Sequence, residues 1–195
     1  YVRNGGILVT TYMSGIVGES DNVYLGGYPG PLKEMAGIWV EEIDALAPEQ
    51  YNVVTFKDGS QSKCKIVCDL MHLEGAESLG EYAEDFYAGM PAATRNTYGN
   101  GKLYYIGSCM EDAGTDKVLA MAAEDAEANP VAGNGNGLEI VKRNGEGKSF
   151  YFVMNFKDEE LEIPEEFAGK KDLLSGNEVE KGEKLPKFGV KIIEE

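Results

Sequence analysis

The feature that most constrains the fold is a pattern that occurs three times: a strand-like segment, a short turn containing glycine, and a second strand-like segment. The three instances cover residues 52–70, 92–107 and 138–156, with turns at 57–60, 98–101 and 144–147. Glycine beside Asn, Asp or Glu between two such segments is typical of a β-hairpin. The sequence therefore predicts that antiparallel strands make up much of the structure.

The segments around these hairpins predict the remaining elements of the first part of the chain. The apolar run Ile7–Tyr12 indicates a buried parallel strand. Apolar residues within 31–46 recur close to helical spacing, although a strand over 38–43 is an alternative. Thr115 can cap a helix that ends before Pro130. This mixture of helices and strands predicts an α/β domain.

A stretch rich in Pro, Gly and Asn at 129–137 predicts a boundary between two domains, 1–130 and 131–195. The first carries 8 basic and 20 acidic side chains and the second 10 and 14, so their charge differs as well. The alternating glycines within 133–137 lack the lysine, strand and helix of a phosphate-binding loop, and we interpret them as a linker. Further short strands of a small antiparallel all-β domain are expected at 161–163, 171–174 and 189–193.

Composition excludes several classes of protein. The 195 residues include 34 acidic and 18 basic side chains, for a formal net charge of −16. Nucleic acid and anionic membranes both select clustered Lys and Arg, so we expect neither as a partner. No run approaches the roughly 18–20 apolar residues that a membrane-spanning helix requires. An odd number of Cys, three, leaves a thiol free and favours a reducing compartment, which we expect to be the cytoplasm.

The first residues predict that the sequence is a piece of a longer chain. Tyr1–Gly6 is typical of the last turn of a helix with a left-handed glycine cap, and a buried strand follows directly. The beginning of that helix and an initiating Met are both missing.

One enzymatic hypothesis comes from the only His. His72 and Glu74 form a His-x-Glu pair that could belong to a nucleophile–His–acid triad, with Glu74 orienting the imidazole. The nearest nucleophile is Ser14, which follows the strand at 7–12. Such a chain would be a small hydrolase or amidotransferase.

A metal site is the weaker hypothesis for the cysteines. Alternation from Cys64 to Leu70 predicts one buried strand face that includes Ile66 and Cys68. On a regular strand the two thiols would lie about 13 Å apart, too far to share one zinc ion with His72. We therefore expect no metal here. The neighbouring carboxylates at 41–44 and 84–85 are expected to lie on a solvated face.

Several longer segments resemble one family, the glycoside hydrolase family 42 β-galactosidases. They are Gly15-Ile16-Val17, 25–32, 37–46, 72–77 and 85–96, followed by looser matches at 171–176 and 188–190. The resemblance covers essentially the whole chain and is most specific before residue 100. At 18–21, this chain has Gly-Glu-Ser-Asp where family members often carry a more acidic run.

The resemblance implies a parent enzyme of three parts. A catalytic (β/α)8 barrel would carry both glutamates of a retaining mechanism that hydrolyses terminal non-reducing β-D-galactosides. A trimerisation domain with a glutamine-amidotransferase-like (flavodoxin-like) α/β fold and a small all-β domain would follow. This chain would contain most of the second part and all of the third, without catalytic residue, metal or cofactor. The parent would be a homotrimer whose galactoside substrate binds the barrel.

The expected role of these residues is therefore assembly and bracing of the barrel. The loop 24–31 combines glycines and prolines with two aromatic side chains, so it can present Tyr24 and Tyr28 to a partner; Trp39 is a third possible interface residue. A carbohydrate-binding module on the β domain is a further alternative.

Overall fold

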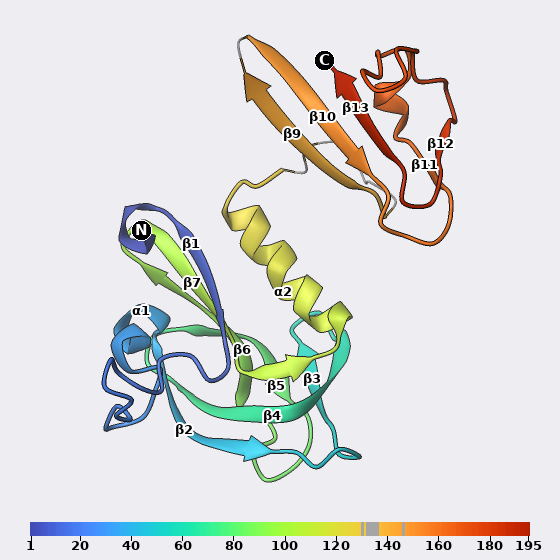
Figure 1. Cartoon of the computed structure of the whole chain (residues 1–195). Helices are drawn as coiled ribbons and strands as arrows, with labels where there is room; N and C mark the ends of the chain where they lie inside the picture. The colour runs from blue at the N-terminus through green and yellow to red at the C-terminus, as the bar shows by residue number, and fades with distance from the viewer. Residues whose placement is uncertain (130, 132–136, 146) are drawn as a thin grey trace. The chain divides into compact units, whose positions relative to one another are not determined.

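In a computed structural model, which describes residues 1–129, 131, 137–145 and 147–195, the chain divides into two units (Figure 1). Unit 1 is Tyr1–Ala128 and unit 2 is Asn129–Glu195. Most of the predicted linker at 129–137 and one residue of the predicted turn at 144–147 lie outside the described residues.

A mixed sheet of eight strands forms most of unit 1. The strands are β1 (Ile7–Thr11), β2 (Ile38–Ala45), β3 (Asn52–Phe56), β4 (Gln61–Leu73), β5 (Glu77–Tyr82), β6 (Pro91–Tyr98), β7 (Gly101–Ile106) and β8 (Ser108–Met110). The helical elements are η1 (Val2–Asn4), η2 (Gly30–Leu32), α1 (Lys33–Ala36) and α2 (Asp112–Asp125). The strand order is β1-β7-β6-β5-β3-β4-β2, and β8 pairs with β4. Among the described strands, only β1 and β7 pair in parallel.

The sequence predicted much of unit 1 correctly. The hairpins β3–β4 and β6–β7 are confirmed, as is the parallel strand that begins at Ile7. For residues 31–46 the strand alternative holds, because Gly37, with φ of 62°, ends α1 after four residues. The predicted cap at Thr115 is wrong: α2 begins at Asp112, and the Thr115 hydroxyl donates to the Met110 carbonyl instead.

Strand β4 overturns the prediction for the cysteines. At Ile66 the backbone turns left-handed, with φ of 70°, and the pairing of β4 with β8 shifts register between Lys65 and Cys68. Ile66, predicted to be buried, is therefore 61 % exposed. The bulge also brings the Cys64 and Cys68 sulfurs to 3.9 Å, far closer than the spacing of a regular strand predicts.

The sheet of unit 1 has a core on each face. Residues along β7 alternate between them: Tyr104 belongs to the core that α2 covers through Val118, and Tyr105 belongs to the core that includes Ile38 of β2. The Tyr104 hydroxyl donates to Asp125 at the end of α2 (2.5 Å). Each face of the strand thus has its own packing partner.

Unit 2 consists of two small antiparallel sheets around a separate core. Its elements are β9 (Glu139–Gly145), β10 (Lys148–Met154), β11 (Leu161–Glu162), η3 (Glu165–Phe167), β12 (Lys184–Leu185) and β13 (Val190–Glu194). The order of the larger sheet is β13-β10-β9, and β11 pairs with β12. The hairpin predicted at 138–156 is confirmed as β9–β10.

The strand predicted at 171–174 is wrong, since the structure has only single bridges there. The buried carboxylate of Asp172 accepts the N–H groups of Leu174 (3.1 Å) and Ser175 (3.3 Å). These local bonds turn the chain away from a strand.

Asp125 supplies the first test of the fold. Besides the Tyr104 hydroxyl it accepts Lys102 Nζ (2.6 Å) and Arg95 (3.2 Å), so it ties the end of α2 to β6 and β7. We expect Asp125→Asn to lower the free energy of unfolding by about 1–3 kcal/mol, because three donors lose a charged acceptor. Asp116→Asn, at an exposed position of the same helix, should stay within about 0.5 kcal/mol. Urea denaturation followed by fluorescence of the only Trp, Trp39 of unit 1, distinguishes the two; equal losses would contradict this account.

Candidate functional site

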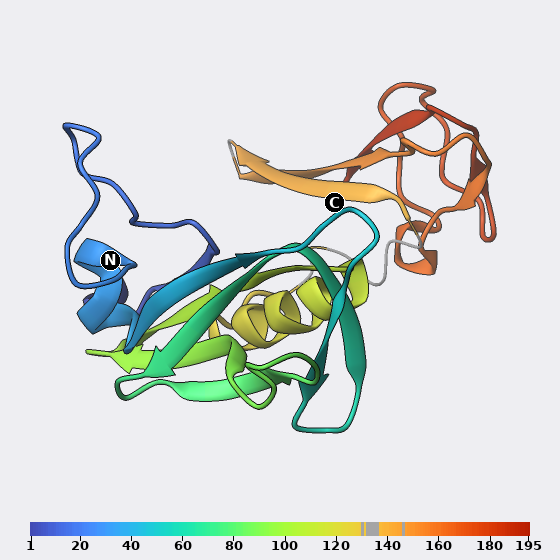
Figure 2. The same ribbon diagram turned by 90° about the horizontal axis from the view of Figure 1, so that it is seen from below.

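A long loop between β1 and η2 extends away from the sheet of unit 1 (Figure 2). We call residues 12–29 the arm. Its last residues are tied to β2, since the Val40 N–H donates to the Tyr28 carbonyl (2.6 Å). Gly27, with φ of 84°, lies so close to the Trp39 ring that a Cβ there would be 2.9 Å from it. Glycine is therefore required where the arm crosses Trp39.

A buried carboxylate fixes the base of the arm. The Tyr28 hydroxyl donates to Asp69 (2.9 Å), and Tyr105 donates to the other oxygen of the same carboxylate (2.7 Å). Asp69 is fully buried on β4, and its N–H donates to the Gly107 carbonyl. Burial raises the pKa of Asp69 to about 6 although both hydroxyls lower it; burial likewise raises the pKa values of Tyr28 and Tyr105.

The tip of the arm is a small turn with apolar side chains around it. Val17 and Val23 form an antiparallel bridge, closed by a hydrogen bond from the Gly18 N–H to the Asn22 carbonyl (2.9 Å). Leu25 is 99 % exposed and Val23 is 64 % exposed. An ordered backbone thus presents apolar surface to solvent, which is typical of a protein interface.

The three side chains predicted as interface residues lie at different depths around the arm. Tyr24 is 38 % exposed, with its ring against Gly30. Tyr28 points inward to Asp69. The half-buried Trp39 stacks on His72, with 4.6 Å between ring centroids.

Sequence reasoning missed Leu25 and Val23. The available signal was their position, since apolar residues in a turn segment rich in Gly, Asp and Asn have few neighbours that could cover them.

The structure does not bring the proposed triad together. The Ser14 hydroxyl accepts from Thr10 (2.6 Å), His72 Nε2 pairs with Glu41 (2.7 Å), and Glu74 lies 3.7 Å from Lys33 Nζ. No hydrogen bond or ion pair between Ser14, His72 and Glu74 occurs in the described part of the chain. Ser14 therefore has neither His72 nor Glu74 as an adjacent base.

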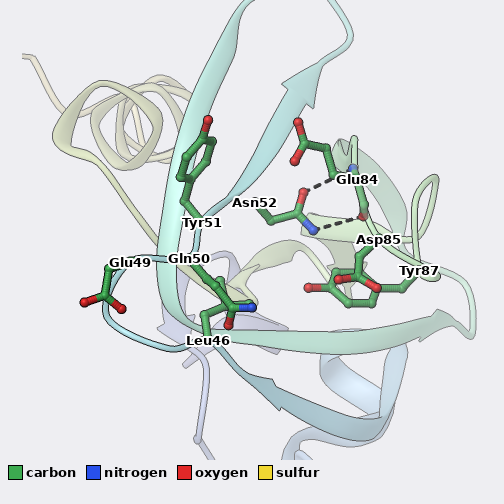
Figure 3. A pocket seen from close by; sticks show the side chains of 8 residues that line it. All are labelled: Leu46, Glu49, Gln50, Tyr51, Asn52, Glu84, Asp85 and Tyr87. Atoms are coloured by element: carbon green, nitrogen blue, oxygen red, sulfur yellow. Dashed lines mark hydrogen bonds between the residues drawn. The ribbon is translucent and has the colours of Figure 1, made fainter.

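A pocket of about 300 Å3 opens beside the loop before β6 (Figure 3). Its lining includes Glu49, Asn52, Glu84, Asp85 and Tyr87. The Asn52 side chain donates to the Glu84 carbonyl (3.0 Å) and accepts the Glu84 N–H (3.1 Å), so it holds the loop rather than facing a ligand.

The described residues include neither a metal-binding cluster nor a membrane-spanning helix. No group of three or more His, Cys, Asp or Glu there is arranged to hold a metal ion. None of the helices in that part is long and apolar enough to cross a membrane.

Replacing Asp69 by Asn tests how this buried carboxylate makes stability depend on pH. Its folded pKa of about 6 lies above the ordinary 3.8, so its stabilising contribution is complete below about pH 4 and is lost as pH rises through 6. We expect Asp69→Asn to remove this loss. The difference in free energy of unfolding between the variant and the unmutated chain should therefore change by about 3 kcal/mol between pH 4 and pH 7. Urea titrations across that range measure it, with Asp116→Asn as the control. Parallel pH profiles for Asp69→Asn and the unmutated chain would contradict it.

Comparison with sequence families matches both units. Residues 1–129 match the family model described as the β-galactosidase trimerisation domain, and residues 137–195 match the β-galactosidase C-terminal domain.

Comparison with individual proteins agrees. The chain is 46 % identical over 182 residues to the β-galactosidase LacA of Lactobacillus acidophilus, which covers 93 % of this chain and 27 % of that protein. It is 40 % identical over 202 residues to BglY of Alicyclobacillus acidocaldarius, covering 100 % and 29 %. This chain therefore spans less than a third of these relatives.

Solved structures give the same result. A β-galactosidase from Bacillus circulans superposes with a TM-score of 0.90 at 40 % identity, over 99 % of this chain and 29 % of that one. Gan42B, a GH42 β-galactosidase, superposes at 0.86 with 35 % identity, over 100 % and 28 %. These matches do not favour a small hydrolase or amidotransferase that uses Ser14, His72 and Glu74, nor a carbohydrate-binding module.

Proposed function

The chain belongs to the β-galactosidases of glycoside hydrolase family 42, and from this membership we propose that its residues assemble and brace such an enzyme as a homotrimer. The matched family is named for trimerisation, and this chain spans 27–29 % of its relatives. The reaction of the whole enzyme would be hydrolysis of terminal β-D-galactosides with retention. Its two catalytic carboxylates would lie in a barrel outside these 195 residues.

The observation that carries the proposal is the arm. Assembly needs apolar surface on a backbone that is already ordered, because ordering a loop on binding costs free energy. The arm meets both requirements: Tyr28 and Gly27 hold its base against the sheet, while Leu25 and Val23 are exposed at its tip. We propose that the arm contacts a neighbouring copy, with Tyr24 at the edge of the contact.

Two further properties belong to this proposal. An amidotransferase-like ancestry of unit 1 is supported by the parallel pair β1–β7 and by α2, which packs against both strands. A cytoplasmic location is supported by the three cysteines, all present as free thiols.

Light scattering across a concentration series tests the assembly. We expect a mass of three times the 21.2 kDa of the chain, and Leu25→Ser should raise the concentration at which it forms by at least about tenfold, since a buried Leu contributes some 1.5–3 kcal/mol.

Leu174→Ser is the matched control, because Leu174 of unit 2 is also exposed (61 %) and the chemical change is the same. A chain that stays monomeric at high concentration, or equal effects of the two substitutions, would overturn the assignment to the arm.

A further inference from the structure

The bulge in β4 creates a pair of thiols that the assembly role does not use. Cys64 and Cys68 are both fully buried, and their sulfurs lie 3.9 Å apart within the core of unit 1. We propose that they are a redox modification site, which a small peroxide closes to a disulfide within one strand.

The backbone spacing allows this bond. Cys64 pairs with Met110 and Cys68 with Ser108, so the two cysteines face residues only two positions apart on β8. Two positions on a strand span about 6.8 Å, at the upper end of the Cα separations found in disulfides. Cys64 and Cys68 are four positions apart in sequence. Because of the bulge around Ile66, they are separated by the distance that two positions span on a regular strand.

The surroundings distinguish the two thiols chemically. The hydrogen bond between the two sulfurs is the main cause of a lowered pKa for Cys64, and together with burial it raises the pKa of Cys68. Ser108, opposite Cys68, is buried and its hydroxyl has no hydrogen-bond partner in the described part of the chain. A free hydroxyl beside the pair can donate to a sulfur that becomes negative.

A route for a small oxidant lies nearby. Tyr87 lines the pocket of Figure 3 and also lies beside Cys68, so the pocket reaches a side chain that contacts the pair.

The chemistry balances with peroxide as the oxidant. The Cys64 thiol loses its proton and the thiolate attacks one peroxide oxygen. The O–O bond breaks, and the leaving hydroxide takes up that proton as water, so that Cys64 becomes a sulfenic acid. The Cys68 sulfur then attacks the Cys64 sulfur, and the sulfenic oxygen leaves as water. Two thiols and one hydrogen peroxide thus yield one disulfide and two waters. The product carries no charge, which suits a buried site.

The experiment treats the whole chain with hydrogen peroxide, denatures it, alkylates the remaining thiols and digests with trypsin. Lys63 and Lys65 flank Cys64, so cleavage separates the peptide Cys64-Lys65 from the peptide 66–95 that carries Cys68. We expect these peptides to stay joined, to separate on reduction, and only one of the three thiols, Cys109, to be alkylated.

Two variants serve as matched controls. Cys109→Ser should leave the linked peptide unchanged, whereas Cys68→Ser should abolish it. Recovery of Cys64 and Cys68 both alkylated while Cys109 is oxidised would overturn the proposal, and so would a bond that includes Cys109. Because the first measurement uses the unmutated chain, its result stands even where a variant fails to fold.

Discussion

Strand β4 pairs with β2, β3 and β8 along its thirteen residues, and most of what is distinctive in unit 1 depends on it. The bulge at Ile66 separates the segment of β4 that pairs with β3 from the segment that pairs with β2, while β8 pairs with residues on both sides of it. The same strand carries the buried carboxylate of Asp69 and the pair of thiols. Substitutions in β4 therefore affect the sheet, the arm and the thiol pair together.

The arm shows how a polar interaction can position an apolar surface. A fully buried carboxylate is costly, and here two tyrosine hydroxyls compensate part of that cost. Because Tyr28 belongs to the arm and Tyr105 to the sheet, Asp69 links the two. The exposed Leu25 can then be presented by a loop without regular secondary structure, since the base rather than the tip supplies the rigidity.

Sequence patterns predicted the hairpins and the parallel strand because those features depend on local turn chemistry and alternation. They failed where one residue changed the geometry: the left-handed Ile66 has no signature, since isoleucine rarely adopts positive φ. The His-x-Glu pair failed for another reason, because Glu41 from a neighbouring strand takes the imidazole. The predicted interface role of the aromatic residues stays a prediction, and Tyr28 points inward to Asp69. The exposure of Leu25 depends on how the arm folds back.

Tyr104 and Tyr105 are adjacent on β7 yet bond to carboxylates on opposite faces of the sheet, Asp125 and Asp69. If β7 slipped by one residue along its neighbours, both hydroxyls would exchange faces and lose their acceptors. The register of β7, which lies between β1 and β6, is thus fixed from both faces of the sheet. A single-residue insertion or deletion within β7 would therefore separate both tyrosines from their carboxylates at once.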